Sequence, residues 1–478
     1  MSHSDPHSPG KDLAQRLREA CAQVTLAALP GARQLPILTG LTQKCVFFEP
    51  LENVLARGRQ ILVQAGRVYA YAGEAVYEVG EGPDKALVPL TRGRKVEPWA
   101  ASLLANELVC QHHNADGEPM QFAPPGPLIG VLLNSAPTLE ALPVVRVYAT
   151  RPVFDSQFVL HGPGWHPATG CLVHGPDIDP IFSPPADPGL PIRQRLPHHL
   201  GTLLGDFCFK AEADWANAVA ALLTGLLVAG FVTATKAVVL LDGNQPSVGK
   251  TWLARVIGII LDGIDPQLIH FTPDDEELAK RICATLRGSP QSVLLIDNAK
   301  VRGGGALSSP VLEANSMAPQ LALRILGRSA NYTRPNDLVW LVTMNDTKAS
   351  SDLVSRGVPV RFRYDGDPRQ RDFQGRDPIR YAREHRAAIL GELMGMVVGW
   401  NQAGRPPGPR KHRCSYWAEV VGGILQVAGL PEFLANLDEA AAAFNQALDQ
   451  LAALAEAVAA AGDPALIAIL DASEGGHS

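Results

Sequence analysis

The chain has 478 residues, of which 46% are hydrophobic and 19% are charged, and this composition is typical of a globular protein. The length suffices for about three domains. The formal net charge of −6 excludes a surface that is basic throughout, so a nucleic-acid site would have to be a local basic patch or the interior of a ring.

The seven cysteines are scattered along the chain and include no Cys-x-x-Cys pair. This pattern predicts free thiols in a reducing cytoplasm and argues against a zinc site or a disulfide framework. Residues 1–10 are polar and lack the apolar core of a signal peptide. We therefore expect a cytoplasmic protein.

Residues 1–140 are expected to form an N-terminal α+β module. The segment 60–79 alternates in hydropathy and carries glycines at turn spacing, which predicts a small β-meander. The segment 98–109 predicts a helix. Residues 141–200 are rich in proline and glycine, and we expect them to form a connecting segment with short strands.

The segment 200–235 predicts a helix, and its part Ala216–Thr235 carries no charge. A stretch of that length can span a bilayer. However, after Lys236 the chain continues directly into the apolar run Ala237–Leu241, which predicts the strand in front of a nucleotide-binding loop. A strand that carries such a loop cannot emerge directly from lipid. The alanines, threonines and glycines of Ala216–Thr235 therefore favour a helix buried in a protein core, and we expect no membrane partner.

A phosphate-binding loop follows the apolar run Ala237–Leu241, which predicts a buried parallel strand, and precedes a helical pattern from Trp252 to Leu261. Strand, loop and helix start direct backbone N–H groups and the positive end of a helix dipole to one point, which favours a phosphate. The predicted nucleotide-binding residues are Gly243, Asn244, Gln245, Pro246, Ser247, Val248, Gly249, Lys250, Thr251 and Trp252.

The side chains of Lys250 and Thr251 supply the chemistry of this loop. The lysine can reach the β- and γ-phosphates of ATP, and the threonine hydroxyl can hold Mg²⁺. In the usual spacing a glycine stands where this chain has Asn244, and Gly243 lies one residue too far from the lysine. Because asparagine tolerates left-handed backbone better than most residues, we expect the loop to close.

Two further strands are predicted to end in polar residues beside this loop. The run Ser292–Ile296 leads to Asp297, whose carboxylate suits the water shell of a magnesium ion. The run Leu338–Met344 leads to Asn345, which can orient a water molecule against the γ-phosphate. Strands and helices alternate over residues 236–365, which predicts a parallel α/β sheet.

Arg356 is the predicted arginine finger. It follows Asn345 on a predicted short helix and can reach across a subunit boundary to stabilise charge on a transferring phosphoryl group. A surface arginine held in a salt bridge is the alternative reading. Arg361, on the next predicted strand, is a second candidate for the same role.

The general base is assigned to Glu277 or Glu276. Many ring ATPases have a glutamate directly after the strand aspartate, where this chain has Asn298. The acidic cluster Asp274–Glu277 precedes that strand and could supply a carboxylate. An acidic helix N-terminus, which favours such residues for electrostatic reasons, explains the same cluster without any catalytic role.

Taken in order, these residues resemble the ATPase module of mobile-element and phage primase-helicases, relatives of the superfamily 3 (poxvirus-type) helicases in the AAA+ class. The most specific part of the resemblance spans residues 292–362, and a weaker likeness covers about residues 140–436. Two departures stand out. The phosphate loop is one residue longer than usual, and Arg356 is single where the family often has paired arginines.

The resemblance implies a P-loop AAA+-type parallel sheet core at residues 201–365 and a C-terminal helical domain at residues 366–478, after the N-terminal α+β module. It also implies a hexameric ring that uses ATP and Mg²⁺, hydrolyses ATP at subunit interfaces and pulls single-stranded or forked DNA through its centre. The expected protein is therefore an ATPase and DNA helicase or translocase of a phage, plasmid or integrated element. A separate primase or replication protein is a possible partner.

Two segments are candidates for DNA contact. Residues 361–386 contain eight arginines (361, 363, 369, 371, 376, 380, 383 and 386) against five acidic residues (365, 367, 372, 377 and 384), although an ion-paired linker would have the same composition. The segment Arg302–Gly305 predicts a loop that could face a central channel.

Two other functions remain open from the sequence. The same ring could act as an assembly switch or defence protein that recruits a partner without translocating. A P-loop kinase acting on a small molecule would also use the phosphate loop, but it gives no role to Asn345 or Arg356.

Overall fold

The protein is described here by a computed structural model. The described residues are 37–38 and 48–439, apart from short gaps at 93–94, 114–115, 185–186, 188, 232, 289–290, 301–306, 327–330, 346–348 and 369–376. The chain divides into two compact units, one comprising residues 1–68 and 89–142 and the other comprising residues 69–88 and 143–478. The predicted channel loop Arg302–Gly305 lies outside the described residues.

In the first unit, helices α2 to α5 pack around an apolar core that includes Leu62, Leu104 and Leu132. Helices α2 and α4 approach so closely that a Cβ atom on Gly58 would lie 2.5 Å from Cδ2 of Leu132. The helices are α2 (Phe48–Gln64), α3 (Pro98–Glu107), α4 (Gly126–Asn134) and α5 (Ala136–Ala141).

Short strands complete the first unit. They are β1 (Ile37–Leu38), β5 (Thr91–Arg92), β6 (Lys95–Val96), β7 (Val109–His113) and β8 (Pro119–Phe122). Strand β7 pairs in parallel with β1 and antiparallel with β8, and β5 forms a hairpin with β6. The predicted helix at 98–109 corresponds to α3. The predicted meander starts later than expected, because residues 60–64 belong to α2, which buries Ile61 and Leu62.

The second unit begins with small sheets that precede the main one. Their strands are β2 (Val68–Tyr71), β3 (Glu74–Val79), β4 (Ala86–Pro89), β9 (Val147–Ala149), β10 (Val153–Phe154), β11 (Leu160–His161), β12 (Gly164–His166) and β13 (Cys171–Val173). Strands β2, β3 and β4 form one sheet, and β9, β12 and β13 form another.

The segment 69–88 therefore differs from the predicted domain division, which assigned it to the N-terminal module. Its side chains Tyr69, Tyr71 and Leu87 are buried in one cluster with Tyr148 and Leu172 from the later sheet. This shared apolar core explains why the segment belongs to the second unit although it precedes part of the first unit in the chain.

A five-stranded parallel sheet forms the centre of the second unit, as the alternation of predicted strands and helices indicated. Its strands are β14 (Val238–Gly243), β15 (Leu268–His270), β16 (Val293–Ala299), β19 (Val339–Met344) and β20 (Gly357–Phe362). The spatial order is β15-β16-β19-β14-β20, and every neighbouring pair is parallel. Strand β19 thus lies between β14 and β16.

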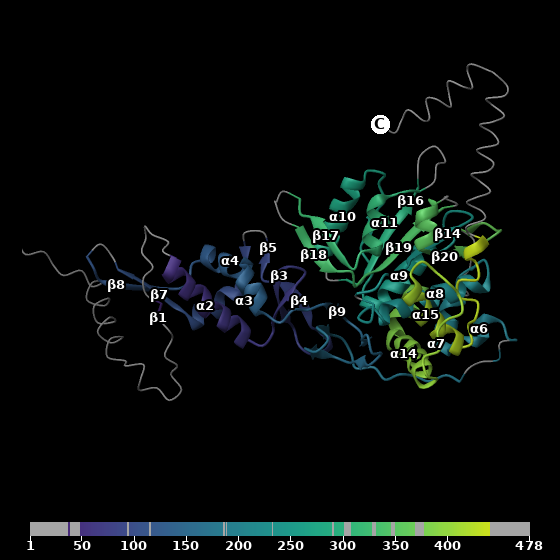
Figure 1. Cartoon of the computed structure of the whole chain (residues 1–478), viewed down its shortest axis with the longest axis horizontal. Coiled ribbons are helices and arrows are strands. Elements are labelled where there is room, and N and C mark those ends of the chain that lie inside the picture. The colour runs from purple at the N-terminus through teal and green to yellow at the C-terminus, as the bar shows by residue number, and fades with distance from the viewer. Residues whose placement is uncertain are drawn as a thin grey trace, which may run out of the picture. The chain divides into compact units, whose positions relative to one another are not determined.

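Alternate residues of these strands face two separate apolar cores, as the twofold repeat of a strand requires. Leu241 and Leu295 face the helices α8 (Glu212–Leu226), α9 (Lys250–Asp262), α14 (Arg386–Gln402) and α15 (Ser415–Val427). Leu240 and Leu294 face α10 (Asp275–Gly288), α11 (Pro310–Met317) and the hairpin β17 (Gln320–Arg324)–β18 (Asn331–Pro335). The sheet is the middle layer of three (Figure 1).

The remaining helices of the second unit are short. They are α6 (Ile192–Arg195), α7 (His198–Leu204), α12 (Ser351–Arg356), α13 (Pro378–Glu384) and the 3-10 helix η2 (Gly82–Asp84). Helices α13, α14 and α15 agree with the helical character predicted after residue 366.

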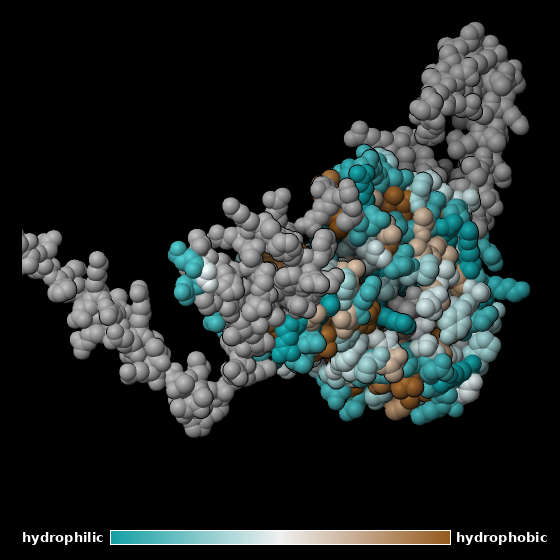
Figure 2. Space-filling view, turned by 60° about the vertical axis from the view of Figure 1, so that its left-hand side comes forward, coloured by the Kyte–Doolittle hydropathy of each residue, from teal (hydrophilic) through white to brown (hydrophobic). Residues whose placement is uncertain are grey.

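Residues 216–226 of the uncharged segment form most of α8, and their side chains Leu222 and Leu226 are fully buried in the core. Within the described part of the chain, no helix combines the length and the apolar character needed to cross a bilayer. On the face shown in Figure 2, hydrophobic residues occur in small groups among hydrophilic ones.

Candidate functional site

The carboxyl ends of β14, β16 and β19 meet at one edge of the sheet because these strands are adjacent and parallel. Leu241 lies opposite Thr343, and Val342 lies opposite Ile296. The residues that follow each strand are therefore neighbours in space although they are far apart in sequence. Open parallel sheets bind ligands at this edge.

The loop between β14 and α9 turns through two residues with left-handed backbone. Ser247 has φ 64° and Gly249 has φ 107°, and helix α9 begins at Lys250. A helix start has unpaired N–H groups and a partial positive charge, so this point can hold an anionic oxygen group. The glycine meets the backbone requirement directly, whereas the serine accepts a strained conformation.

Asn244 holds the loop in a way that the sequence did not predict. It is absent from the residues with positive φ, so its tolerance of left-handed backbone is not what closes the loop. Its side chain donates from Nδ2 to the carbonyl oxygen of Tyr364 at 3.0 Å and accepts at Oδ1 from the amide of Tyr364 at 3.2 Å. The amide side chain thus pins the loop to the segment that follows β20.

Lys250 is buried, and its ammonium group points into the loop. It donates to the carbonyl oxygen of Gln245 at 3.0 Å, and its residue exposure is 6%. Burial lowers the pKa of Lys250, and the negative charges nearby, including Asp242 and Asp297, act in the opposite direction. A buried cation with a single carbonyl partner is suited to receive a phosphate oxygen.

Asp297, near the end of β16, accepts hydrogen bonds from two threonines at the same oxygen. The hydroxyl of Thr251 donates to Oδ1 at 3.1 Å, and the hydroxyl of Thr343 donates to it at 2.8 Å. The Thr343 hydroxyl also accepts from the amide of Asn298 at 2.8 Å. A hydroxyl beside a carboxylate is an oxygen ligand set that Mg²⁺ prefers.

Thr343 is a site residue that sequence reasoning missed. Its hydroxyl is almost fully buried and fixes the side chain of Asp297. The only sequence signal is a polar residue within the apolar run of β19, two positions before Asn345. That signal has no meaning until the strand order is known.

Asn345 follows β19 and lies beside Asn298. Its Nδ2 donates to Oδ1 of Asn298 at 3.4 Å, and Asn298 has left-handed backbone with φ 57°. Asn298 lies in the stretch of β16 where its pairing register with β19 shifts, between Ile296 and Ala299. Two amide side chains therefore stand together next to Asp297 at the edge of the sheet.

A cavity of about 670 Å³ opens at this edge, which is a volume typical of small-ligand sites. The structure brings four predicted site residues to its wall, namely Lys250, Thr251, Asp297 and Asn345, together with Trp252 and part of the loop. The wall consists of Pro246, Ser247, Gly249, Lys250, Thr251, Trp252, Arg255, Asp265, Pro266, Leu268, Asp297, Asn298, Thr343 and Asn345.

Arg356 ends the short helix α12, as predicted, but it is not part of this wall within one chain. Its guanidinium pairs with Asp352 at 2.6 Å and donates to the carbonyl oxygen of Glu313. Arg361 pairs with Asp214 at 3.5 Å and with Glu439 at 2.9 Å. Both arginines have partners in their own chain, and a role for Arg356 in a neighbouring subunit stays a prediction.

Glu277 and Glu276 lie in the first turn of α10 and are not among the residues that line the cavity. Glu277 pairs with Arg281 at 3.0 Å, and Glu276 pairs with Lys280 at 2.9 Å. Both are i,i+4 pairs on the surface of one helix, as expected for an acidic helix start. The structure does not bring either glutamate to the other site residues.

The arginines between 361 and 386 that the structure describes are engaged in ion pairs or in helix capping. Arg363 pairs with Asp365, Arg380 with Glu384 and Arg383 with Asp265. Arg386 donates to the carbonyl oxygens at the end of α9. These contacts correspond to the ion-paired alternative, and positions 369, 371 and 376 lie outside the described residues.

No protein-family model matches this chain, and no curated protein is significantly similar to it in sequence. Among solved structures, it is similar to the apo C-terminal region of NrS-1, with a TM-score of 0.37 and 10% identity over 78% of this chain and 74% of that chain. It is also similar to the X-ray structure of JCV helicase, with a TM-score of 0.23 and 18% identity over 47% of this chain and 64% of that chain.

Proposed function

We propose that this chain is an AAA+-type ATPase that hydrolyses ATP to ADP and phosphate and uses the reaction to move or unwind nucleic acid. The observation that carries the proposal is the cavity wall on which Lys250, Thr251 and Asp297 come together at the start of α9. A strand order in which β19, with its polar tip Asn345, separates the phosphate-loop strand from the aspartate strand supports the AAA+-type assignment.

The residues fit a nucleoside triphosphate and its metal. The left-handed turn at Ser247 and Gly249 and the start of α9 suit phosphate oxygens, and the buried ammonium of Lys250 suits a γ-phosphate. Thr251 and Asp297 would hold Mg²⁺, directly or through its water shell. When bound, this ion would neutralise charge on the phosphates.

The remaining chemistry belongs to side chains. Lys250 would stabilise the charge that grows on the transferring phosphoryl group, and Thr343 would keep Asp297 oriented. Asn345 and Asn298, which contact each other at the rim, would orient the attacking water. Among the described residues that line the cavity, the carboxylates belong to Asp265 and Asp297, so no glutamate base is assigned here.

Arg356 would complete the site from an adjoining copy. Within the chain, Arg356 pairs with Asp352, and Asp352 also pairs with Arg413 at 2.6 Å. If Arg356 were released, Asp352 would therefore still have Arg413 as its partner. Release would also break the hydrogen bond from Arg356 to the carbonyl oxygen of Glu313, which the phosphoryl oxygens of the neighbouring site would have to replace. The proposal therefore requires an oligomer, and the family resemblance suggests a hexameric ring.

The hairpin β17–β18 is the element that we propose contacts nucleic acid. Leu321 and Leu323 on β17 are buried against the core, whereas Gln320, Ala322 and Arg324 alternate with them and are exposed. Leu326, just beyond the strand, is 77% exposed. An exposed apolar side chain next to a cation suits single-stranded DNA, which offers both bases and phosphates.

A second candidate function is an assembly switch or defence protein in which the same ATPase cycle controls a protein partner. It is favoured by the ion pairs of Arg363, Arg380 and Arg383, since these three side chains already have acidic partners within the chain. The first unit, residues 1–68 and 89–142, would then carry the partner site.

The decisive experiment measures ATP hydrolysis with and without single-stranded DNA, beside the molecular mass in solution with bound nucleotide. A helicase or translocase predicts an oligomer whose hydrolysis rises with DNA, and Arg324→Ala should remove that rise while leaving the DNA-free rate unchanged. Hydrolysis that responds only to a protein partner would support the switch. A monomer that phosphorylates a small molecule would refute both readings.

A further inference from the structure

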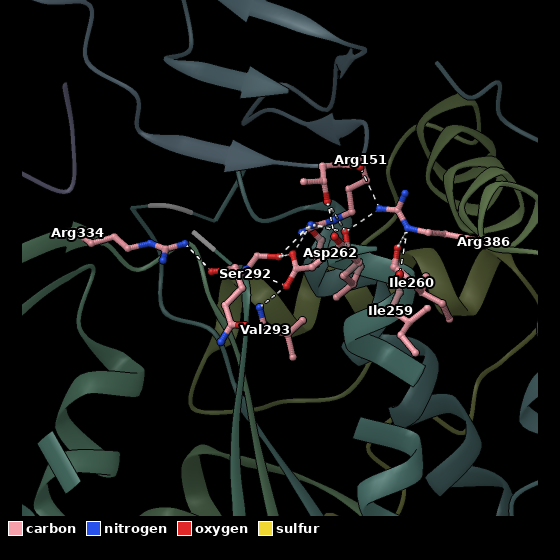
Figure 3. A network of polar contacts seen from close by, with 12 residues as sticks. Arg151, Ile259, Ile260, Asp262, Ser292, Val293, Arg334 and Arg386 are labelled. Carbon is pink, nitrogen blue, oxygen red and sulfur yellow. Dashed lines mark hydrogen bonds and ion pairs between the residues drawn. The ribbon is translucent and has the colours of Figure 1, made fainter. Parts of the chain in front are cut away.

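The end of α9 opposite the phosphate loop is tied to the start of β16 by one carboxylate. Oδ2 of Asp262 accepts from the amides of Ser292 and Val293, each at 3.0 Å, and Oδ1 accepts from the Ser292 hydroxyl (Figure 3). Asp262 is the last residue of α9, and Val293 is the first residue of β16. The carboxylate therefore fixes the register of this helix against this strand.

Arg151 reinforces the same joint from the loop between β9 and β10. It is fully buried, and its Nη1 donates to the carbonyl oxygen of Leu261 and to the Ser292 hydroxyl, each at 2.9 Å. Its Nη2 donates to the carbonyl oxygen of Gly225 in α8 at 2.6 Å. One guanidinium thus joins α8, α9 and the segment before β16.

Arg386 closes the end of α9 from the other side. Its Nε donates to the carbonyl oxygens of Ile259 at 3.0 Å and Ile260 at 2.9 Å, and its Nη2 donates to that of Leu261 at 3.1 Å. The carbonyl oxygen of Ile259 also accepts from the amide of Gly263, the residue that caps the helix, and a cation at a helix C-terminus is favourable. The last turn of α9 is therefore held firmly in place.

The two elements joined at Asp262 carry the proposed magnesium ligands at their opposite ends. Thr251 stands in the first turn of α9, and Asp297 stands near the end of β16. A helix and a sheet strand are stiff, so a shift of α9 along β16 at Asp262 would be transmitted to Thr251 almost in full. The 3.1 Å contact between Thr251 and Asp297 would not survive a displacement of about 1 Å.

We propose that Asp262 is a positioning residue for the magnesium site, and that it acts by setting the place of Thr251 relative to Asp297. This inference rests on the proposed ATPase function. Asp262 does not touch the cavity, and its effect reaches the metal ligands only through the α9–β16 joint. It predicts that loss of the carboxylate weakens magnesium-dependent nucleotide binding more than it weakens binding without metal.

The test compares Asp262→Asn with the matched control Glu392→Gln. Glu392 is also a buried carboxylate that accepts from two consecutive backbone amides, those of His199 and Leu200, each at 2.8 Å, but it caps α7 instead of joining α9 to β16. The probe is a fluorescent ATP analogue, titrated with Mg²⁺ and with a chelator, and thermal unfolding is measured on the same samples.

For Asp262→Asn we expect the gain in affinity from Mg²⁺ to fall by about tenfold, as for other groups that orient metal ligands, with affinity in chelator unchanged. Glu392→Gln should lower the melting temperature, while Mg²⁺ should raise its nucleotide affinity as much as it does in the wild type. The inference would be overturned if Asp262→Asn lost stability but Mg²⁺ still raised its nucleotide affinity as much as in the wild type.

Ser292→Ala gives a second test in case Asp262→Asn does not fold. It removes only the hydroxyl contacts and leaves both backbone amides on the carboxylate, so we expect cooperative unfolding and a smaller fall in the magnesium gain, of about threefold. An unchanged gain would contradict the inference. If the wild type itself gains no affinity from Mg²⁺ and hydrolyses no ATP, the proposed function fails as well.

Discussion

The hydroxyl of Thr251 donates to Oδ1 of Asp297 across 3.1 Å, although the two residues are 46 positions apart in the chain. One stands in the first turn of α9 and the other near the end of β16. Thr343, from the strand between β14 and β16, donates to the same oxygen at 2.8 Å. The oxygen atoms proposed as magnesium ligands thus come from two elements and are oriented by a third.

Thr343→Val should reduce ATP hydrolysis by about tenfold, because Asp297 loses a donor that orients it. The amide of Asn298 also loses its acceptor, which should lower the free energy of unfolding by about 1–2 kcal/mol. The control is Thr224→Val, since the Thr224 hydroxyl is likewise buried and makes two hydrogen bonds, to Ala220 and Trp417. Thr224→Val should lose stability and keep the wild-type rate of ATP hydrolysis. If Thr343→Val hydrolysed ATP as fast as Thr224→Val, the proposed role of Thr343 would be wrong.

Asn244→Ala should raise the ATP concentration needed for half-maximal rate by about tenfold. The change removes two hydrogen bonds to Tyr364, each worth about 1 kcal/mol, that hold the phosphate loop. Steady-state kinetics measure the effect. Asn134→Ala, which removes a helix-end hydrogen bond to Gly130, serves as the control and should behave as wild type. An unchanged KM in Asn244→Ala would show that this clamp does not shape the loop.

Mixtures of two inactive variants test the cross-subunit role of Arg356. Arg356→Ala keeps the phosphate loop, and Lys250→Ala keeps the arginine, so a mixed oligomer contains some interfaces with both residues intact. Each variant alone should lose at least about 100-fold in rate. The mixture should recover a measurable fraction of the wild-type rate. A mixture as inactive as its components would contradict a role in trans, as would full activity of Arg356→Ala alone.

The fold could be predicted from the sequence where local pattern and core position agree. The apolar run before the phosphate loop became β14, and the helical pattern after it became α9. The predictions failed where tertiary packing decides. Residues 60–64 look like the start of a meander, but the burial of Ile61 and Leu62 among other helices makes them helical.

The site could be predicted only as far as residues adjacent to recognisable strands. Lys250 and Asp297 stand near recognisable apolar runs and were predicted as site residues, whereas a role for Thr343 required the strand order, which is a long-range property. The partner of Arg383 is Asp265, 118 positions away, so the pairing of the basic segment could not be read from composition. The role of Glu277 was ambiguous because the electrostatics of a helix N-terminus favour an acidic residue there even when it has no catalytic role.

The stability of the second unit should depend on pH through Glu78. A hydrogen bond with His174 at 2.8 Å lowers the pKa of Glu78 from 4.5 to about 2, against the effect of burial, and Tyr69 adds a further hydrogen bond. A depressed carboxyl pKa stabilises the fold above the unfolded value of 4.5, and this contribution is lost as the pH falls from 4.5 towards 2.

Glu78→Gln should therefore lower the free energy of unfolding by about 3 kcal/mol at pH 7, and roughly half of the difference from wild type should vanish by about pH 3. Thermal or urea unfolding at both pH values measures it. Glu384→Gln is the control, because its pair with Arg380 is exposed and contributes little. A difference that stays constant between pH 7 and pH 3 would rule out the ionised Glu78 as its source.

The most direct measurement of the central claim is the rate of magnesium-dependent ATP hydrolysis by wild type, Lys250→Ala and Lys280→Ala. Lys250 is buried at the cavity wall, whereas Lys280 forms a surface pair with Glu276 at 2.9 Å. We predict that Lys250→Ala loses at least about 100-fold in rate while Lys280→Ala matches wild type. Hydrolysis by Lys250→Ala at the wild-type rate would show that ATP is not hydrolysed at this cavity.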